Sequence, residues 1–346
     1  MQLAGQARPP VGVVFDTGLT RIDDALAMAV LYGFDGKNEI RVISFSVTRS
    51  NLKAAAFCEV VGSFYAGAVS AAFGAVGRTL PIGMATDGKL AEDERWFVEP
   101  LERSDADGKP VYKHAIHRMI DTADPIAVMR NALTGQYDAN AIVLLSGPAT
   151  NLANLLALHG AKEWITRKVK FLVVAAGAYP YGPAESCIKL DVGAAQKLFA
   201  EWPTPIVACG AEIGSALQYP ASSIEKDFAW TTMHPVVDAY RTYRSMPYDA
   251  PGEAIAAALY AARPKETYFQ LSDPGTITVT PEGRTKFSAS ADGKHRYVIV
   301  NADQKDRIIK SFTEIASAKP VPRPRFPRPP QDKQKQQDKE KAEAKQ

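Results

Sequence analysis

The stretch that decides the fold is VVFDTGLTRIDDALAMAVLY, residues 13–32, in which an apolar run leads through a glycine-bearing turn into an amphipathic helix. Three carboxylates, those of Asp16, Asp23 and Asp24, lie in or beside the turn. This order places them at the carboxyl end of a strand, where open α/β sheets bind ligands. Adjacent ionised carboxylates repel each other, and a hard cation with oxygen ligands relieves the repulsion. The stretch therefore predicts a ligand or metal site, with simple helix capping as the alternative.

Strand-like runs and helical periodicity alternate along most of the remaining chain. Apolar runs at residues 40–47, 141–146, 171–176 and 206–208 predict strands, and the segments between them have helical spacing. This alternation is typical of βαβ units, so we predict an α/β fold with an open, mostly parallel sheet flanked by helices. Near the end, the runs TITVT and KFSA flank the turn at residues 281–284 and predict antiparallel strands.

The length and composition predict one large domain with flexible ends. The chain has 346 residues and 46% hydrophobic content, which is enough to bury a full core. We predict a flexible N-terminus over residues 1–10, a folded domain over residues 11–318, and a disordered tail over residues 319–346, whose proline and charge content cannot build a core. Residues 74–122 carry many charges, Gly and Pro, and predict a long excursion over the ligand end of the sheet.

Charge and cysteine content exclude several classes of function. The net charge is only +3 and much of the basic excess lies near the C-terminus, so no nucleic-acid groove is predicted. The three cysteines lie far apart without a C-x-x-C pair, which argues against a zinc site and a disulfide framework. No apolar stretch approaches the roughly 20 residues that span a bilayer. The opening residues carry no secretory signal, so we predict a cytoplasmic protein, or a periplasmic one if an export signal was removed.

The acidic turn resembles the N-terminal signature of the inosine-uridine nucleoside hydrolases, an Asp-x-Asp-x-x-x-Asp-Asp run that holds calcium and supplies the general base. Here Gly18 stands where that family has its second Asp, the base, and the gap to the paired aspartates is one residue longer. The resemblance implies that Asp16 and Asp24 are calcium ligands and that Asp23 contacts the substrate. If the protein is a hydrolase, Asp16 or Asp23 would replace the missing aspartate as the general base.

Two further segments resemble the same family. In LLSGPATNLA, the resemblance implies that the backbone carbonyl of Thr150 is a calcium ligand and that Asn151, which starts a helix, lies at the substrate. A plain strand-to-helix connection is the alternative. In ESCIKLDVGAA, Glu185 matches a sugar-binding glutamate, and Cys187 stands where the family has an asparagine. A thiol is a weak hydrogen-bond donor, so the affinity for a ribosyl group is expected to fall. Alternatively, Cys187 is a small buried apolar residue.

The fourth segment, MPYDAPGEAIAAALYA, resembles the family's last acidic motif. The resemblance implies that Asp249 is a calcium ligand, with a plain helix N-cap as the alternative. Tyr248 stands where the family often has a histidine that protonates the leaving base. A phenol can donate a proton, but its pKa of about 10 suits acid catalysis at neutral pH less well than imidazole does.

The four motifs lie in the family's order and imply a nucleoside hydrolase-like fold. The implied function is calcium-dependent hydrolysis of the N-glycosidic bond of a ribonucleoside or related ribosyl compound, in purine or pyrimidine salvage. The implied partners are the small-molecule substrate and further copies of the chain, in a dimer or tetramer, without nucleic acid or membrane. The alternative is a catalytically impaired pseudoenzyme that binds a sugar or nucleoside or acts as a scaffold.

Overall fold

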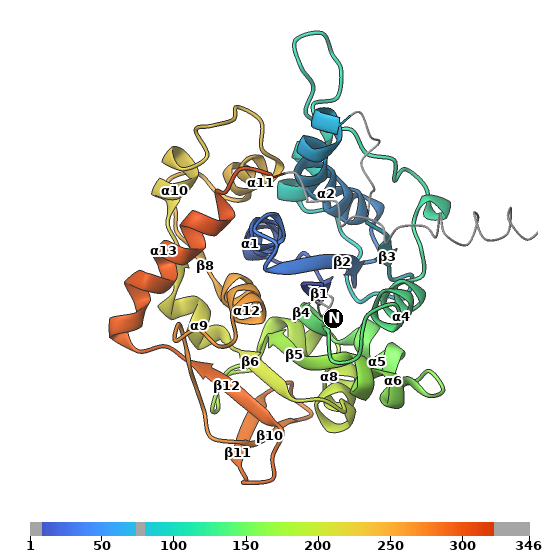
Figure 1. Cartoon of the computed structure of the whole chain (residues 1–346), viewed down its shortest axis with the longest axis vertical. Helices are drawn as coiled ribbons and strands as arrows, with labels where there is room; N and C mark the ends of the chain where they lie inside the picture. Colours follow the sequence, from blue (N-terminus) through green and yellow to red (C-terminus); the bar gives the residue numbers. More distant parts are fainter. Residues whose placement is uncertain (1–8, 74–79, 322–346) are drawn as a thin grey trace, which may run out of the picture.

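The computed structural model describes residues 9–73 and 80–321. Within this part of the chain, the centre is a ten-stranded sheet in the order β11-β10-β12-β6-β5-β4-β1-β2-β3, and β9 pairs with β12 beside this path (Figure 1). A second, two-stranded sheet joins β7 and β8. The strands are β1 (Val11–Thr17), β2 (Ile40–Val47), β3 (Ile82–Met84), β4 (Ala141–Ser146), β5 (Val169–Ala175), β6 (Ile206–Cys209), β7 (Gln218–Tyr219), β8 (Ala250–Pro251), β9 (Gln270–Leu271), β10 (Gly275–Val279), β11 (Thr285–Ala289) and β12 (His295–Ile299).

The sheet is mostly parallel, which confirms the predicted fold class. Strands β1 to β6 run parallel to their neighbours in the path, and β12 runs parallel to β6. The pairs of β10 with β11, β10 with β12 and β9 with β12 are antiparallel. Every residue of β4 is buried, as expected of a central strand covered by helices on both faces. This burial explains why β4 appears in the sequence as a continuous apolar run rather than an alternating one.

Two layers of helices cover the sheet. On one face α1 (Ile22–Gly36) packs against α12 (Glu253–Ala262), and α13 (Lys305–Ala316) packs outside them (Figure 1). On the other face, α4 (Pro125–Thr134) and α8 (Val192–Glu201) pack over a second, separate cluster of buried apolar side chains. The remaining helices are α2 (Leu52–Phe73), α3 (Arg95–Glu102), α5 (Thr150–Leu156), α6 (Ala161–Lys168), α7 (Ser186–Leu190), α9 (Ala211–Ala216), α10 (Ala221–Lys226), α11 (Pro235–Tyr243) and the short 3₁₀ turns η1 (Met119–Asp121) and η2 (Ala302–Gln304).

The segment predicted as an excursion contains regular structure as well as loops. Its residues 80–122 supply the edge strand β3 and the helix α3, which packs against α2 and α11. The strand has only three residues, too few for a periodic signal. Residues 74–79 lie outside the described residues, as do most of the predicted N-terminal segment and most of the predicted tail.

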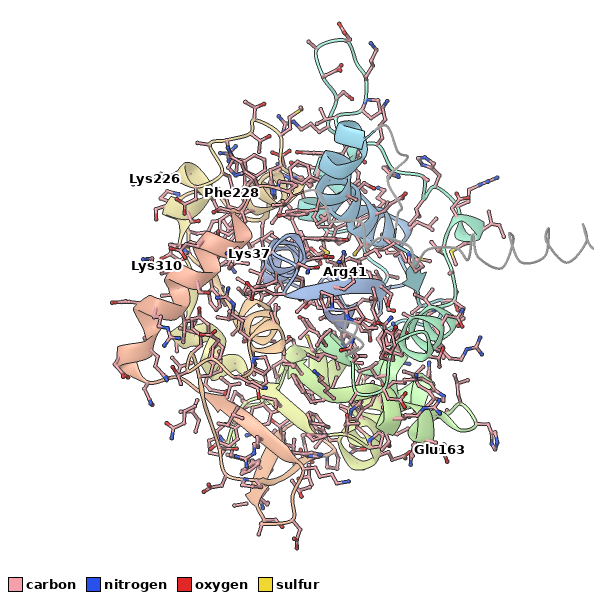
Figure 2. All side chains as sticks on the ribbon, viewed as in Figure 1. Lys37, Arg41, Glu163, Lys226, Phe228 and Lys310 are labelled. Atoms are coloured by element: carbon pink, nitrogen blue, oxygen red, sulfur yellow. The ribbon has the colours of Figure 1, made fainter. Side chains whose placement is uncertain are left out.

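Charged side chains lie mainly on the outside of this body. Figure 2 shows Glu163, Lys226 and Lys310 pointing away from the ribbon, and all three are exposed. Among the described helices, none combines the length and apolar character that crossing a membrane requires. The exposed charges make the buried carboxylates described below stand out, because acidic groups are rarely buried without a partner.

The register of the central strands brings their carboxyl ends to one edge. Thr17 of β1 pairs with Ser146 of β4, and Leu145 of β4 pairs with Val174 of β5. Immediately beyond β4, Gly147 has a φ of 151°, and a Cβ atom there would lie 2.5 Å from the backbone nitrogen of Gly18. Glycine at this point therefore lets the turns after β1 and β4 approach closely.

Candidate active site

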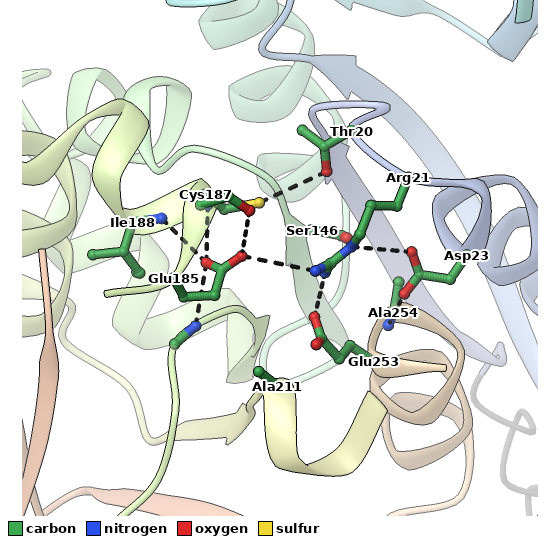
Figure 3. Close-up of polar contacts among 12 residues, drawn as sticks. Thr20, Arg21, Asp23, Ser146, Glu185, Cys187, Ile188, Ala211, Glu253 and Ala254 are labelled. Atoms are coloured by element: carbon green, nitrogen blue, oxygen red, sulfur yellow. Dashed lines mark hydrogen bonds and ion pairs between the residues drawn. The ribbon is translucent and has the colours of Figure 1, made fainter. Parts of the chain in front are cut away.

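Three buried carboxylates surround one arginine at this edge of the sheet (Figure 3), and a fourth, that of Asp24, acts on the same arginine electrostatically. Asp23 and Asp24 lie in the first turn of α1, Glu185 precedes α7, and Glu253 is the first residue of α12. Arg21 extends from the turn before α1 into the middle of the group. The site is therefore assembled from three helix N-termini, whose partial positive charge favours acidic groups.

The guanidinium of Arg21 reaches three of these carboxylates. Its Nε lies 3.5 Å from Oδ1 of Asp23, and its Nη1 lies 3.8 Å from Oε1 of Glu185. Its Nη2 donates a hydrogen bond to Oε2 of Glu253. Burial favours the neutral form of Arg21, but the carboxylates of Asp23 and Glu253 outweigh it and raise its pKa above the ordinary value. Arg21 therefore stays protonated at any physiological pH.

Two carboxylates of this group, those of Glu253 and Asp24, are less readily ionised than exposed ones. Burial, which outweighs the attraction of Arg21, raises the pKa of Glu253 to about 8. Burial, together with the negative charge of Asp23, raises the pKa of Asp24 to about 7. Both oxygens of Asp24 already accept hydrogen bonds: Oδ1 from the hydroxyl of Ser146, and Oδ2 from the backbone N–H of Thr20 at 2.8 Å. Asp24 therefore fixes the turn between β1 and α1.

Asp16 lies apart from this group, at the end of β1. Its Oδ1 accepts a hydrogen bond of 2.9 Å from the side-chain amide of Asn151, whereas its buried Oδ2 has no hydrogen-bond donor among the described residues. Burial raises the pKa of Asp16 to about 8, although the bond from Asn151 opposes the shift. The neighbouring Thr150 donates its hydroxyl to Asp191 at 2.7 Å. Asn151 therefore positions Asp16 and leaves one carboxylate oxygen free.

Glu185 and Cys187, which the sequence analysis singles out, lie beside Arg21 and Thr20 respectively. Oε2 of Glu185 accepts the backbone N–H groups of Cys187 at 2.9 Å and Ile188 at 3.2 Å, so it caps α7 while its other oxygen faces Arg21. The thiol of Cys187 is buried, lies 3.7 Å from the hydroxyl of Thr20, and has a pKa well above its ordinary value because of burial. Cys187 therefore packs as a small neutral side chain.

Asp249 and Tyr248 are not brought to the site. The side chain of Asp249 is exposed, and its Oδ1 accepts a hydrogen bond of 2.8 Å from the backbone N–H of Ala221. The hydroxyl of Tyr248 donates to the carbonyl of Tyr240 at 2.6 Å, and the two rings stack 4.4 Å apart. The carboxylate that α12 places beside Arg21 belongs to Glu253.

Sequence reasoning missed Arg21, Glu253 and Ser146. Each had a signal. Arg21 is a lone cation between the acidic turn and the paired aspartates, and Glu253 opens the apolar helix that Asp249 precedes by four residues. Ser146 ends an apolar strand that runs beside β1. The sequence alone does not reveal which of these polar groups face one another in the fold.

The donor set does not fit the calcium ion that the resemblance implies. Of the predicted ligands, Asp24 has both oxygens engaged by protein donors and Asp249 lies elsewhere. The guanidinium of Arg21 adds a fixed positive charge that repels a dication. In residues 9–73 and 80–321, no group of three or more His, Cys, Asp or Glu side chains is arranged to hold a metal ion.

A second arginine fixes the turn that carries this site. Arg49 is buried, and its guanidinium donates to the carbonyl oxygens of Gly18 at 3.3 Å, Leu19 at 3.4 Å and Glu92 at 2.6 Å. Gly18, which stands where the resemblance places a catalytic aspartate, has little free space. A Cβ atom there would lie 2.9 Å from Cγ2 of Thr20. A side chain at position 18 would therefore require Thr20 to shift.

A parallel α/β sheet with acidic groups beyond its central strands is an arrangement in which open α/β proteins bind ligands at the carboxyl ends of the strands. The family model described as inosine-uridine preferring nucleoside hydrolase matches residues 13–313, and the chain belongs to this family. A comparison with curated proteins gives no significant match.

Solved structures of nucleoside hydrolases share the fold. A plant nucleoside hydrolase, PpNRh1, is 18% identical over 90% of this chain and 100% of its own, with a TM-score of 0.65. The purine-preferring ribonucleoside hydrolase from Gardnerella vaginalis is 16% identical over 88% and 98%, with a TM-score of 0.63. The inosine-uridine preferring nucleoside hydrolase from Bacillus anthracis is 17% identical over 89% and 99%, with a TM-score of 0.59.

Proposed function

We propose that this protein hydrolyses the N-glycosidic bond of a ribonucleoside or a related ribosyl compound, with Asp16 as the general base. The observation that carries the proposal is the geometry of Asp16: a buried carboxylate at the end of a central strand, held by Asn151 through one oxygen, with the other oxygen free of donors. Family membership supports the substrate class.

The proposed reaction uses the chain's own carboxylates. Oδ2 of Asp16 takes a proton from a water molecule, whose oxygen forms a bond to the anomeric carbon. The bond to the nucleobase breaks, and the nucleobase leaves with the bonding electron pair and takes up a proton from the solvent. A pKa of about 8 makes Asp16 a stronger base than an ordinary carboxylate, at a value near neutral pH. The sugar becomes oxocarbenium-like in the transition state, and the carboxylates of Asp23 and Glu185 stabilise this developing positive charge. Because the donor set does not fit calcium, no step uses the metal.

A second candidate function is ribosyl binding without turnover. It is favoured by Gly18, because the position that supplies the base in the resembling family carries no side chain here. In this case the carboxylates would recognise sugar hydroxyls, and the protein would act as a nucleoside-binding or scaffolding member of its family.

A panel of purine and pyrimidine ribonucleosides, scored for released ribose, tests the two candidates. Hydrolysis by the wild-type protein that rises with pH through about 8 and is lost in Asp16→Asn supports the first. A rise in melting temperature with a nucleoside, without ribose release at any pH, supports the second. Neither release nor a thermal shift with any member of the panel contradicts both.

A further inference from the structure

Arg21 occupies the centre of the acidic site in a way that a surface arginine does not. Its side chain is 24% exposed, whereas the side chains of Asp23, Glu185 and Glu253 are only 1%, 6% and 5% exposed. Figure 3 shows the guanidinium lying between these three carboxylates, with each on a different side of it. The side chain therefore enters the cluster from the solvent and ends among groups that are otherwise sealed from water.

The cluster needs a positive charge. Burying an ionised carboxylate without a partner is strongly unfavourable, and here several lie within reach of one another. Among the described residues, Arg21 is the cationic side chain that forms ion pairs with Asp23, Glu185 and Glu253. The charge that the resemblance assigns to a calcium ion is therefore supplied by a side chain at this point.

An arginine suits this task better than a lysine. The three carboxylates come from three separate helices, and the planar guanidinium offers five N–H donors in a fixed fork, so it can reach all of them at once. A lysine ammonium is a compact point charge with fewer donors. The chemistry of the group thus matches the spread of its partners.

We propose that Arg21 is the internal cation of this site and replaces the divalent metal of the resembling family. It joins α1, α7 and α12 through Asp23, Glu185 and Glu253, and its solvent-facing side donates hydrogen bonds to the hydroxyl groups of a bound sugar. The role in ligand binding rests on the proposed function, whereas the role in charge balance does not.

Calcium titration by calorimetry tests the charge balance without any measurement of activity. The full chain is first treated with a chelator and then titrated with calcium chloride. The wild-type protein is expected to show no saturable binding heat and no rise in melting temperature with calcium. Stoichiometric calcium binding by the wild type, abolished in Asp24→Asn, would overturn the proposal.

Arg21→Met supplies the converse test, because it keeps the length of the side chain and removes its charge. This variant is expected to melt at a lower temperature than the wild type and to regain several degrees when calcium is added. Arg21→Lys, which keeps one charge, is expected to show no calcium response. A folded Arg21→Met variant that ignores calcium, or an Arg21→Lys variant that responds as strongly, contradicts the proposal.

Arg130→Ala is the matched control, since Arg130 is an exposed helical arginine whose side chain hydrogen bonds, among the described residues, only to the side-chain oxygen of Asn131. It is expected to melt like the wild type, with or without calcium. If Arg21→Met does not fold, the wild-type and Arg21→Lys titrations still decide the question. Ribose release by the wild-type protein in excess chelator tests the ligand role, so a failed hydrolase proposal leaves the calcium result intact.

Discussion

Asp16 shows how burial can turn an ordinary carboxylate into a candidate base. Its amide partner, Asn151, comes from the helix that follows β4, so the pair joins two neighbouring strands at their carboxyl ends. Burial raises the pKa of Asp16 because its charged form loses the solvation that water provides. The sequence predicted both residues as site residues, but not that they contact each other.

We expect Asp16→Asn to lower kcat by about 10²- to 10⁴-fold, the usual contribution of a general base, with a smaller change in KM. The amide keeps the size of the side chain but cannot accept the proton. Steady-state kinetics of ribose release measure the effect, with the exposed Glu163→Gln as a control that keeps wild-type rates. A kcat within twofold of wild type in Asp16→Asn would remove Asp16 as the base.

His234 is a buried neutral histidine that makes the fold sensitive to acid. Its ring lies against Phe64, Phe228 and Trp230, and its Nε2 lies 3.3 Å from the hydroxyl of Tyr65. Burial lowers its pKa from 6.5 to about 3. Between these two values the unfolded chain binds a proton that the folded chain does not, so His234 lowers the free energy of unfolding as the pH falls.

We therefore expect the pH dependence of stability to differ between the wild type and His234→Phe. Below pH 6.5, the wild type should lose up to about 1.4 kcal/mol per pH unit relative to the variant. The buried carboxylates of the site titrate in both proteins and cancel in the difference. Urea unfolding at a series of pH values measures it, and parallel curves for the two proteins would contradict the assignment.

At the scale of elements, the start of α12 decides which acidic residue joins the site. Asp249 and Glu253 both precede an apolar helical run, and the resemblance favours Asp249. The pairing of Ala250 with Tyr219 in the small sheet holds the chain before the helix, leaving Asp249 exposed and Glu253 at the first helical turn. Such long-range pairing carries no local signal, so the sequence could not choose between the two residues.

We expect Glu253→Gln and Asp249→Asn to separate these residues by stability. Above the pKa of about 8 of Glu253, at about pH 9, removing one partner of a buried ion pair costs about 3–5 kcal/mol, because the other charge remains buried, so Glu253→Gln should be strongly destabilised there. Asp249 is exposed, and an asparagine can still accept the hydrogen bond from Ala221, so Asp249→Asn should change stability by less than about 0.5 kcal/mol. Urea unfolding of both variants checks the order, and the reverse order contradicts this account of α12.

At the scale of the whole molecule, the sequence predicted the parallel part of the sheet better than its edges. The runs that became β1, β2, β4 and β5 are buried on both faces and so appear as clear apolar segments. The position of β12, parallel to β6 yet antiparallel to β10, depends on contacts between distant segments. The predicted dimer or tetramer stays a prediction.

The extent of the folded body is also open to test. The last buried side chains of α13 are those of Phe312, Ile315 and Ala316, and the helix ends there. Deleting residues 322–346 should therefore leave the melting temperature within about 1 °C of wild type, because the proline-rich and charged composition of that segment cannot build a core. Differential scanning calorimetry of the two chains measures this, and a drop of several degrees would mean that the deleted segment packs on the body.

Arg49 has a consequence for how the molecule opens. The guanidinium of Arg49 donates hydrogen bonds both to the turn before α1 and to the backbone carbonyl of Glu92. The backbone of Arg49 also forms an isolated β-bridge with that of Leu90. When the segment around Glu92 detaches, the guanidinium of Arg49 loses a contact that helps to hold it against the carbonyl groups of Gly18 and Leu19. We therefore expect these segments, far apart in sequence, to open together, so that their backbone amides exchange hydrogen with a common free energy of opening.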